Sequence, residues 1–157
     1  MILNLSSQSP EQTKSIGYKI GSLLKGSELI LLSGDLGMGK TLITKGIAEG
    51  IGISENEIVS PTFTLQNRYI SNKKTYLCHF DMYRIGGSMA GQSGLISPEI
   101  DEELGENIVI VEWAQYLHES YFKVPDVIKI EITIPNDNLN ERRIIINTSF
   151  KPILTNL

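Results

Sequence analysis

The sequence predicts a mixed α/β fold, in which a sheet with a parallel core and antiparallel hairpins is flanked by helices. Three observations carry this prediction. A glycine-rich loop at residues 34–41 joins a short apolar run to a segment with helical spacing. A second apolar run, Ile108 to Val111, is typical of a strand buried on both faces. Residues 128–148 alternate between apolar and polar around a turn, which indicates a hairpin. The 157 residues fit one domain.

The first expected element is a helix that begins near residue 10. Ser9, Pro10 and Glu11 supply a capping hydroxyl, a proline at the first helical position and an acid that suits the helix dipole. Gly26 ends the helix and leads into the next strand. One apolar stripe gives the helix its buried face: Ile16, Ile20, Leu23 and Leu24.

The next elements are a buried strand, Glu28 to Ser33, and the loop that follows it. The loop reads Gly34-Asp35-Leu36-Gly37-Met38-Gly39-Lys40-Thr41 and has the pattern G-x-x-x-x-G-K-[ST]. A random chain of this length contains that pattern on the order of once in two hundred. A helix is expected from Lys40, with isoleucines every four residues until Gly50 and Gly52. Backbone N–H groups and a helix N-terminus together hold phosphates, so this segment predicts a P-loop NTPase-like fold.

From Val59 the pattern changes to alternation, which predicts a hairpin over residues 62–81 with its turn at 71–74. Ser60, Thr62 and Thr64 share one face of the first strand. Thr62 and Thr64 are either contacts for the γ-phosphate side of a nucleotide or strand residues chosen for β-propensity. The return strand ends at Asp81.

A flexible glycine-rich loop is expected at about 86–98, before an acidic segment at 99–106. The buried strand Ile108 to Val111 then ends in Glu112, and weak helical spacing follows through Phe122. The last hairpin pairs a strand at 128–134 with a return strand at 142–148. We expect the tail, about 149–157, to fray.

Composition narrows the classes of function. The net charge of −4 argues against autonomous binding to DNA or RNA, which relies on clustered basic residues. No apolar run is long enough to cross a bilayer and the first residues do not resemble a signal peptide, so a cytoplasmic protein is expected. Cys78 is the only cysteine, which excludes an internal disulfide.

The predicted chemistry is that of ATP and Mg²⁺. Lys40 is expected against the β- and γ-phosphates, and the Thr41 hydroxyl on the metal. Such loops also need an acid at the end of a neighbouring buried strand. Glu112 is the preferred metal ligand, with Asp81 near the attacking water, and the opposite assignment stays open. His79 is expected to be a packed strand residue or a base, and Trp113 a docking or a core residue.

Three strings join the glycine-rich loop to complete a resemblance to the TsaE (YjeE-type) bacterial ATPases, over nearly the whole chain. The resemblance implies an ATPase required for threonylcarbamoyladenosine formation in tRNA, acting with TsaD and TsaB, with tRNA contacted only through these partners and without membrane or DNA binding. The strings are Ser60-Pro61-Thr62-Phe63-Thr64-Leu65, His79-Phe80-Asp81-Met82-Tyr83-Arg84-Ile85 and Ile110-Val111-Glu112-Trp113-Ala114.

The resemblance also assigns residues. Thr41 and Glu112 would bind Mg²⁺, Asp81 and Thr62 would serve hydrolysis, and Pro10 would touch the adenine. The chain departs from the family at Arg68, where an acid is usual, and at residues 86–91, where an acidic helix is usual. The phosphates would be held by consecutive loop residues: Gly37, Met38, Gly39, Lys40, Thr41 and Leu42.

Three alternative functions share the loop. A small GTPase-like switch normally needs Asn-Lys-x-Asp, and the nearest match, Asn72-Lys73-Lys74-Thr75, lacks the aspartate. A small-molecule kinase normally carries an arginine-rich lid, which the sequence does not show. A non-catalytic, nucleotide-gated binding module would use bound ATP only to fix its shape.

Overall fold

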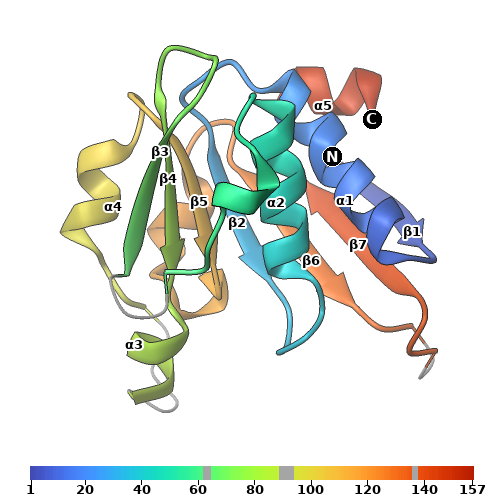
Figure 1. Cartoon of the computed structure of the whole chain (residues 1–157). Helices are drawn as coiled ribbons and strands as arrows, with labels where there is room; N and C mark the ends of the chain where they lie inside the picture. The colour runs from blue at the N-terminus through green and yellow to red at the C-terminus, as the bar shows by residue number, and fades with distance from the viewer. Residues whose placement is uncertain (62–64, 89–93, 136–137) are drawn as a thin grey trace.

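A mixed sheet with helices on both faces forms the body of the protein (Figure 1). The computed structural model describes residues 1–61, 65–88, 94–135 and 138–157. Within these residues seven strands lie in the order β1-β7-β6-β2-β5-β4-β3. Their bounds are β1 Ile2–Ser7, β2 Leu29–Ser33, β3 Gln66–Ile70, β4 Tyr76–Asp81, β5 Ile108–Glu112, β6 Ile128–Thr133 and β7 Arg142–Asn147.

The sheet has a parallel centre and antiparallel sides. Strand β2 pairs in parallel with β5 and β6, and β5 pairs in parallel with β4. The pairs β3–β4, β6–β7 and β1–β7 are antiparallel. This confirms the predicted fold class. Because the carboxyl ends of β2, β4 and β5 meet at one edge of the sheet, the residues that follow or end these strands come together there.

Helices α1 and α2 cover one face of the sheet, and α4 lies on the other (Figure 1). On β2, Ile30 and Leu32 pack with the first pair of helices, while Leu29 and Leu31 pack on the side of Ile100 in α4. Both faces of this strand are therefore buried, as its apolar run predicts. The helices are α1 Pro10–Leu23, α2 Lys40–Gly50, α3 Tyr83–Ser88, α4 Pro98–Glu103 and α5 Lys151–Asn156, with 3-10 helices at Glu55–Glu57, Ala114–Tyr116 and Glu119–Lys123.

Four glycines let α1 and α2 approach each other closely. A β-carbon built on Gly17 or Gly21 of α1 would lie 2.5 or 2.2 Å from the carbonyl oxygen of Ile43 or Ile47. On α2, a β-carbon on Gly46 or Gly50 would meet a carbonyl oxygen of α1 at 2.2 or 2.4 Å. The two backbones are thus in direct contact, which fixes the start of α1 relative to the loop that precedes α2.

Several expected elements differ in the structure. The first strand of the 62–81 hairpin begins at Gln66, and Thr62 and Thr64 lie outside the described residues. Residues 83–88 form α3, which extends into the loop expected over about 86–98, and residues 98–103 form α4 at the start of the expected acidic segment. The weak helical spacing after Glu112 becomes two short 3-10 helices.

The two ends of the chain were the least well predicted. Strand β1 was not expected, and it pairs with β7 across most of the sequence. The prediction that residues 149–157 fray was wrong, because they contain α5, which packs against the core through Phe150 and Ile153. Both of these side chains are buried, and their burial stabilises a helix too short to form alone.

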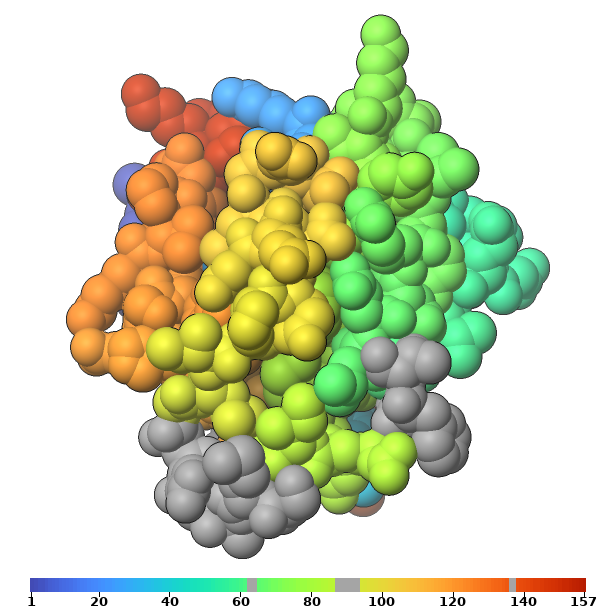
Figure 2. All heavy atoms as spheres, turned by 90° about the vertical axis from the view of Figure 1, so that its left-hand side faces the viewer, coloured from blue at the N-terminus to red at the C-terminus, as the bar shows by residue number. Residues whose placement is uncertain are grey.

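Figure 2 shows the left-hand side of Figure 1, where the segment around α4 lies between the β3–β4 hairpin and the chain that follows β5. Arg68 of β3 pairs there with Glu103 of α4, with 3.6 Å between Nη2 and Oε2. The basic residue at this position thus ties the hairpin to α4. Among the described residues, no helix combines the length and the hydropathy that a membrane span requires.

Candidate functional site

The glycine-rich loop turns from β2 into α2 through backbone conformations that favour glycine. Gly34 has a φ of 143°, and a β-carbon there would lie 2.5 Å from the carbonyl oxygen of Ile132. Gly39, with a φ of 111°, is the N-cap of α2 and gives it no side-chain cap. The first N–H groups of an 11-residue helix therefore point out of the loop, which is the arrangement that binds anions.

Lys40 lies at the centre of this loop and is almost buried, with 5% of its surface exposed. Its Nζ donates to the carbonyl oxygens of Gly34, at 2.6 Å, and Asp35, at 2.8 Å. It also stands 3.8 Å from the ring centroid of Trp113. Burial lowers the pKa of the Lys40 ammonium, while the carboxylates of Glu112 and Asp81 act in the opposite direction. The ammonium is thus held at the mouth of the loop by its carbonyls and one aromatic face.

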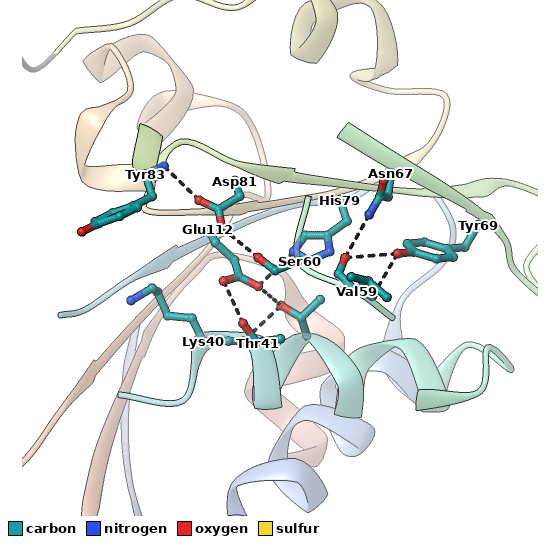
Figure 3. Close-up of polar contacts among 11 residues, drawn as sticks. Lys40, Thr41, Val59, Ser60, Asn67, Tyr69, His79, Asp81, Tyr83 and Glu112 are labelled. Carbon is teal, nitrogen blue, oxygen red and sulfur yellow. Dashed lines mark hydrogen bonds and ion pairs between the residues drawn. The ribbon is translucent and has the colours of Figure 1, made fainter. Parts of the chain in front are cut away.

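Glu112 ends β5 beside the start of α2, and four polar side chains meet there (Figure 3). The Thr41 hydroxyl donates to Oε2 of Glu112 at 3.2 Å, and the Thr44 hydroxyl donates to Oε1 at 3.2 Å. The Nε2 of His79 lies 2.9 Å from Oε1. The carboxylate is 2% exposed, so these donors replace water around it.

Asp81 ends β4 in register with Glu112 on β5. Its Oδ2 accepts from the Ser60 hydroxyl at 2.8 Å and its Oδ1 from the Tyr83 backbone N–H at 2.9 Å (Figure 3). The two acids thus stand side by side at the carboxyl edge of the parallel strands. They keep separate partners, which suits two different roles.

One pocket of ≈ 470 Å³ contains the loop and both acids. A hydroxyl on α2, a carboxylate at a strand end and room for phosphates and water make up the oxygen-rich environment that Mg²⁺ prefers. The donors present therefore fit this ion, with Thr41 and Glu112 nearest to each other. The walls of this pocket are formed by Leu36, Gly37, Gly39, Lys40, Thr41, Leu42, Ser60, Asp81, Tyr83, Glu112 and Trp113.

A second pocket, of ≈ 380 Å³, lies on the other side of the loop. Pro10 and Thr13 of α1 line it together with Gly37, Met38, Gly39 and Leu42 of the loop and α2. Arg142, at the start of β7, forms another wall, and its Nε donates to the Met38 carbonyl oxygen at 3.0 Å. The two pockets share Gly37, Gly39 and Leu42, so they adjoin at the loop.

The structure brings most of the predicted site residues together. Lys40, Thr41, Asp81 and Glu112 share the first pocket, and Pro10 shares the second with Gly37, Met38, Gly39 and Leu42. Thr62 lies outside the described residues. Sequence reasoning missed the contacts of Ser60, Thr44 and Arg142 and left His79 and Trp113 undecided. The one available signal was that Ser60, His79 and Trp113 lie next to or within the strings that carried the resemblance.

The parallel strand, glycine-rich loop and helix, with acids on two neighbouring strand ends, form an arrangement typical of proteins that bind nucleotide phosphates. Comparison with known families is more specific. The family model for the threonylcarbamoyl adenosine biosynthesis protein TsaE matches residues 7–144. The chain therefore belongs to the TsaE family, whose role is in the biosynthesis of threonylcarbamoyladenosine in tRNA.

Individual relatives agree with the family model. The TsaE protein of Aquifex aeolicus (strain VF5) is 39% identical over 140 residues, which cover 87% of this chain and 91% of the relative. The TsaE protein of Bacillus subtilis (strain 168) is 36% identical over 136 residues, covering 86% and 78%. The crystal structure of YdiB from Bacillus subtilis superposes with a TM-score of 0.68 at 30% identity, over 94% of this chain and 86% of that one.

Proposed function

We propose that this protein binds ATP with Mg²⁺ and hydrolyses it in support of threonylcarbamoyladenosine formation, acting with TsaD and TsaB. One observation carries the proposal: Lys40, Thr41, Asp81 and Glu112 line a single pocket at the loop. Phosphoryl transfer to water needs a cation for the phosphates, a hydroxyl and an acid for the metal, and a second acid beside the attacking water. Family membership supports the connection to tRNA modification.

Each residue has a separate task in this proposal. The N–H groups at the start of α2 and the Lys40 ammonium bind the phosphate oxygens and offset their charge. Thr41 and Glu112 would hold Mg²⁺, which neutralises charge on the transferred phosphate. Asp81 orients the attacking water and accepts its proton, because its Ser60 and Tyr83 contacts leave the carboxylate on a wall of the pocket.

The second pocket supports adenine as the base. Pro10 and Leu42 give it apolar walls, while Thr13 and Arg142 give it polar ones. Its volume of ≈ 380 Å³ lies in the range of small-molecule sites. The sequence has no Asn-Lys-x-Asp motif that would favour guanine.

The net charge of −4 supports the proposed partners. A net negative charge argues against autonomous binding to a phosphate backbone. TsaD and TsaB would therefore hold the tRNA, while ATP hydrolysis here would reset or drive the complex. In this function, the chain itself does not catalyse threonylcarbamoyl transfer.

The test is steady-state ATP hydrolysis by the purified chain, alone and with purified TsaD and TsaB. We expect the rate to rise when the partners are added, and Lys40→Ala to reduce it by roughly 100-fold, because the phosphates lose their cation. Lys45→Ala is the matched control, since Lys45 lies on the same helix but does not line the pocket. A rate that never rises with the partners, or a preference for GTP, would contradict the proposal.

A further inference from the structure

We propose that His79 is a positioning residue, which fixes the Glu112 carboxylate so that Oε2 faces Thr41 and the phosphate pocket. This inference rests on the proposed function, in which Glu112 and Thr41 hold Mg²⁺. It concerns the orientation of the ligand rather than its identity. His79 lies in the middle of β4, opposite Ile110 of β5, and none of its surface is exposed.

The hydrogen bond between His79 and Glu112 has a defined direction in the proposed site. The Nε2 of His79 lies 2.9 Å from Oε1 of Glu112, and an ionised carboxylate can only accept. When Glu112 holds Mg²⁺ as proposed, its carboxylate is ionised, so the proton of this hydrogen bond is on Nε2 and His79 donates to Oε1. Figure 3 shows the imidazole and Thr41 on different sides of the Glu112 carboxylate.

The two carboxylate oxygens of Glu112 have different neighbours. Oε1 faces His79 and Thr44, both fully buried and neither part of the pocket wall. Oε2 faces Thr41, which lines the pocket. The single hydrogen of Thr44 is also within reach of the Lys40 carbonyl oxygen, at 3.1 Å. Thr44 therefore divides its hydrogen bond between two acceptors. Among the described residues, the Nε2 of His79 has Oε1 as its one acceptor.

A histidine at position 79 has a cost in the free energy of folding. Its Nδ1 is buried and, within the described residues, has no hydrogen-bond partner. An unpaired buried polar atom costs about 1–3 kcal/mol, which an apolar side chain of similar size would avoid. Packing alone would therefore favour an apolar residue at position 79. Within the part of the chain that the structure describes, the contact between Nε2 and Glu112 is the one polar interaction that accounts for the imidazole.

The chemical consequence concerns the last torsion of the glutamate side chain. That torsion has a broad energy minimum, so an unrestrained carboxylate rotates easily. A donor on the buried side holds Oε1 and leaves Oε2 toward the pocket. Residues that orient a metal ligand in this way typically change metal affinity or activity by about 10- to 100-fold when they are removed.

The experiment compares His79→Asn with His79→Gln. Both variants place a polar amide at the site, but only the longer glutamine carries its N–H group about as far as Nε2 of histidine. The readout is the rise in melting temperature caused by a non-hydrolysable ATP analogue, measured as Mg²⁺ is titrated and again in EDTA. His118→Asn is the control, because the described hydrogen bonds of the His118 ring go to the neighbouring Ser120, away from the pocket.

We expect His79→Asn to need roughly tenfold more Mg²⁺ for half of the Mg²⁺-dependent rise, with an unchanged rise in EDTA. His79→Gln and His118→Asn should match the wild type within about twofold. The inference is overturned if Asn and Gln variants both match the wild type, or if both shift equally, since the N–H group would then not matter. A wild type that does not respond to the analogue would instead contradict the proposed function.

Discussion

At the scale of single residues, Arg142 connects two segments that lie far apart in the sequence. Its Nε donates to the carbonyl oxygen of Met38 in the glycine-rich loop, and its Nη1 donates to the carbonyl oxygens of Leu139 and Glu141. A guanidinium offers five N–H groups in a rigid plane, so one side chain can hold both segments. Arg142 thus supports the loop from the side of the second pocket.

Arg142→Ala should weaken nucleotide binding by roughly tenfold, because hydrogen bonds from charged groups contribute about 1.5–3 kcal/mol and the loop loses one of them. Titration with a fluorescent ATP analogue measures the change. The neighbouring Arg143→Ala provides the control, since the Arg143 guanidinium donates to the exposed side chain of Asn4, at 3.3 Å, and does not line the second pocket. Equal affinities for the two variants would show that the loop does not depend on Arg142.

Residues of the site differ in how far the sequence predicts them. Lys40 and Thr41 follow from a local pattern, because the eight residues of the loop include everything that defines them. The pairing of His79 with Glu112 joins residues 33 positions apart, and that of Arg142 with Met38 joins residues 104 positions apart. No local spacing reports such contacts, since they depend on strand order and register.

At the scale of elements, the contact between α1 and α2 depends on residues without side chains. Gly21→Ala should lower the free energy of unfolding by about 1–3 kcal/mol or more, because its β-carbon would lie 2.2 Å from the Ile47 carbonyl oxygen and force the helices apart. Urea denaturation measures this change. Ser22→Ala, one residue further along on the exposed face of α1, should change stability by less than about 0.5 kcal/mol.

The Gly21→Ala variant would also show whether the proposed nucleotide site depends on the contact between α1 and α2. Pro10 and Thr13 line the second pocket from α1, and the loop lines it from the other helix. A Gly21→Ala variant that remains folded should therefore bind the ATP analogue more weakly than Ser22→Ala does. A stability within 0.5 kcal/mol of the wild type would mean that the helices separate without cost.

The elements that were predicted are those with strong local signals. Helix α1 begins as expected, with the Ser9 hydroxyl accepting from the Gln12 backbone N–H at 3.2 Å. Strands β2, β5 and β6 have apolar or alternating runs that identify them alone. Strand β1 and helix α5 have six residues each, and both are stabilised by distant neighbours. The sequences of these two segments alone therefore contain too little information to predict their secondary structure.

At the scale of the whole molecule, two buried groups link stability to alkaline pH. Burial raises the pKa of the Cys78 thiol from 9.0 to about 12, and that of the Tyr121 hydroxyl from 10.0 to about 12. Both pKa values are higher in the folded protein than in the unfolded chain. The stability they contribute is therefore complete below pH 9.0 and is lost as the pH rises toward about 12.

We expect the urea midpoint of the wild type to fall steadily as the pH rises above about 9. Cys78→Ala should be less stable at neutral pH, because a buried atom is lost, but its midpoint should fall less steeply. The difference between the two proteins should thus narrow from about pH 8 to about pH 10.5. A difference that stays constant over this range would mean that Cys78 ionises alike in both states.

The position of β2 in the middle of the sheet has a consequence for synthesis on the ribosome. Its neighbours β5 and β6 end at Glu112 and Thr133, so the strand that delivers the glycine-rich loop is made 100 residues before its second neighbour is complete. At translation rates of about 5–20 residues per second, that interval lasts roughly 5–20 s. Throughout it the nascent chain holds the glycine-rich loop on a strand that still lacks at least one of its two neighbours. Under the proposed function, the nucleotide site is therefore complete only after translation has passed β6.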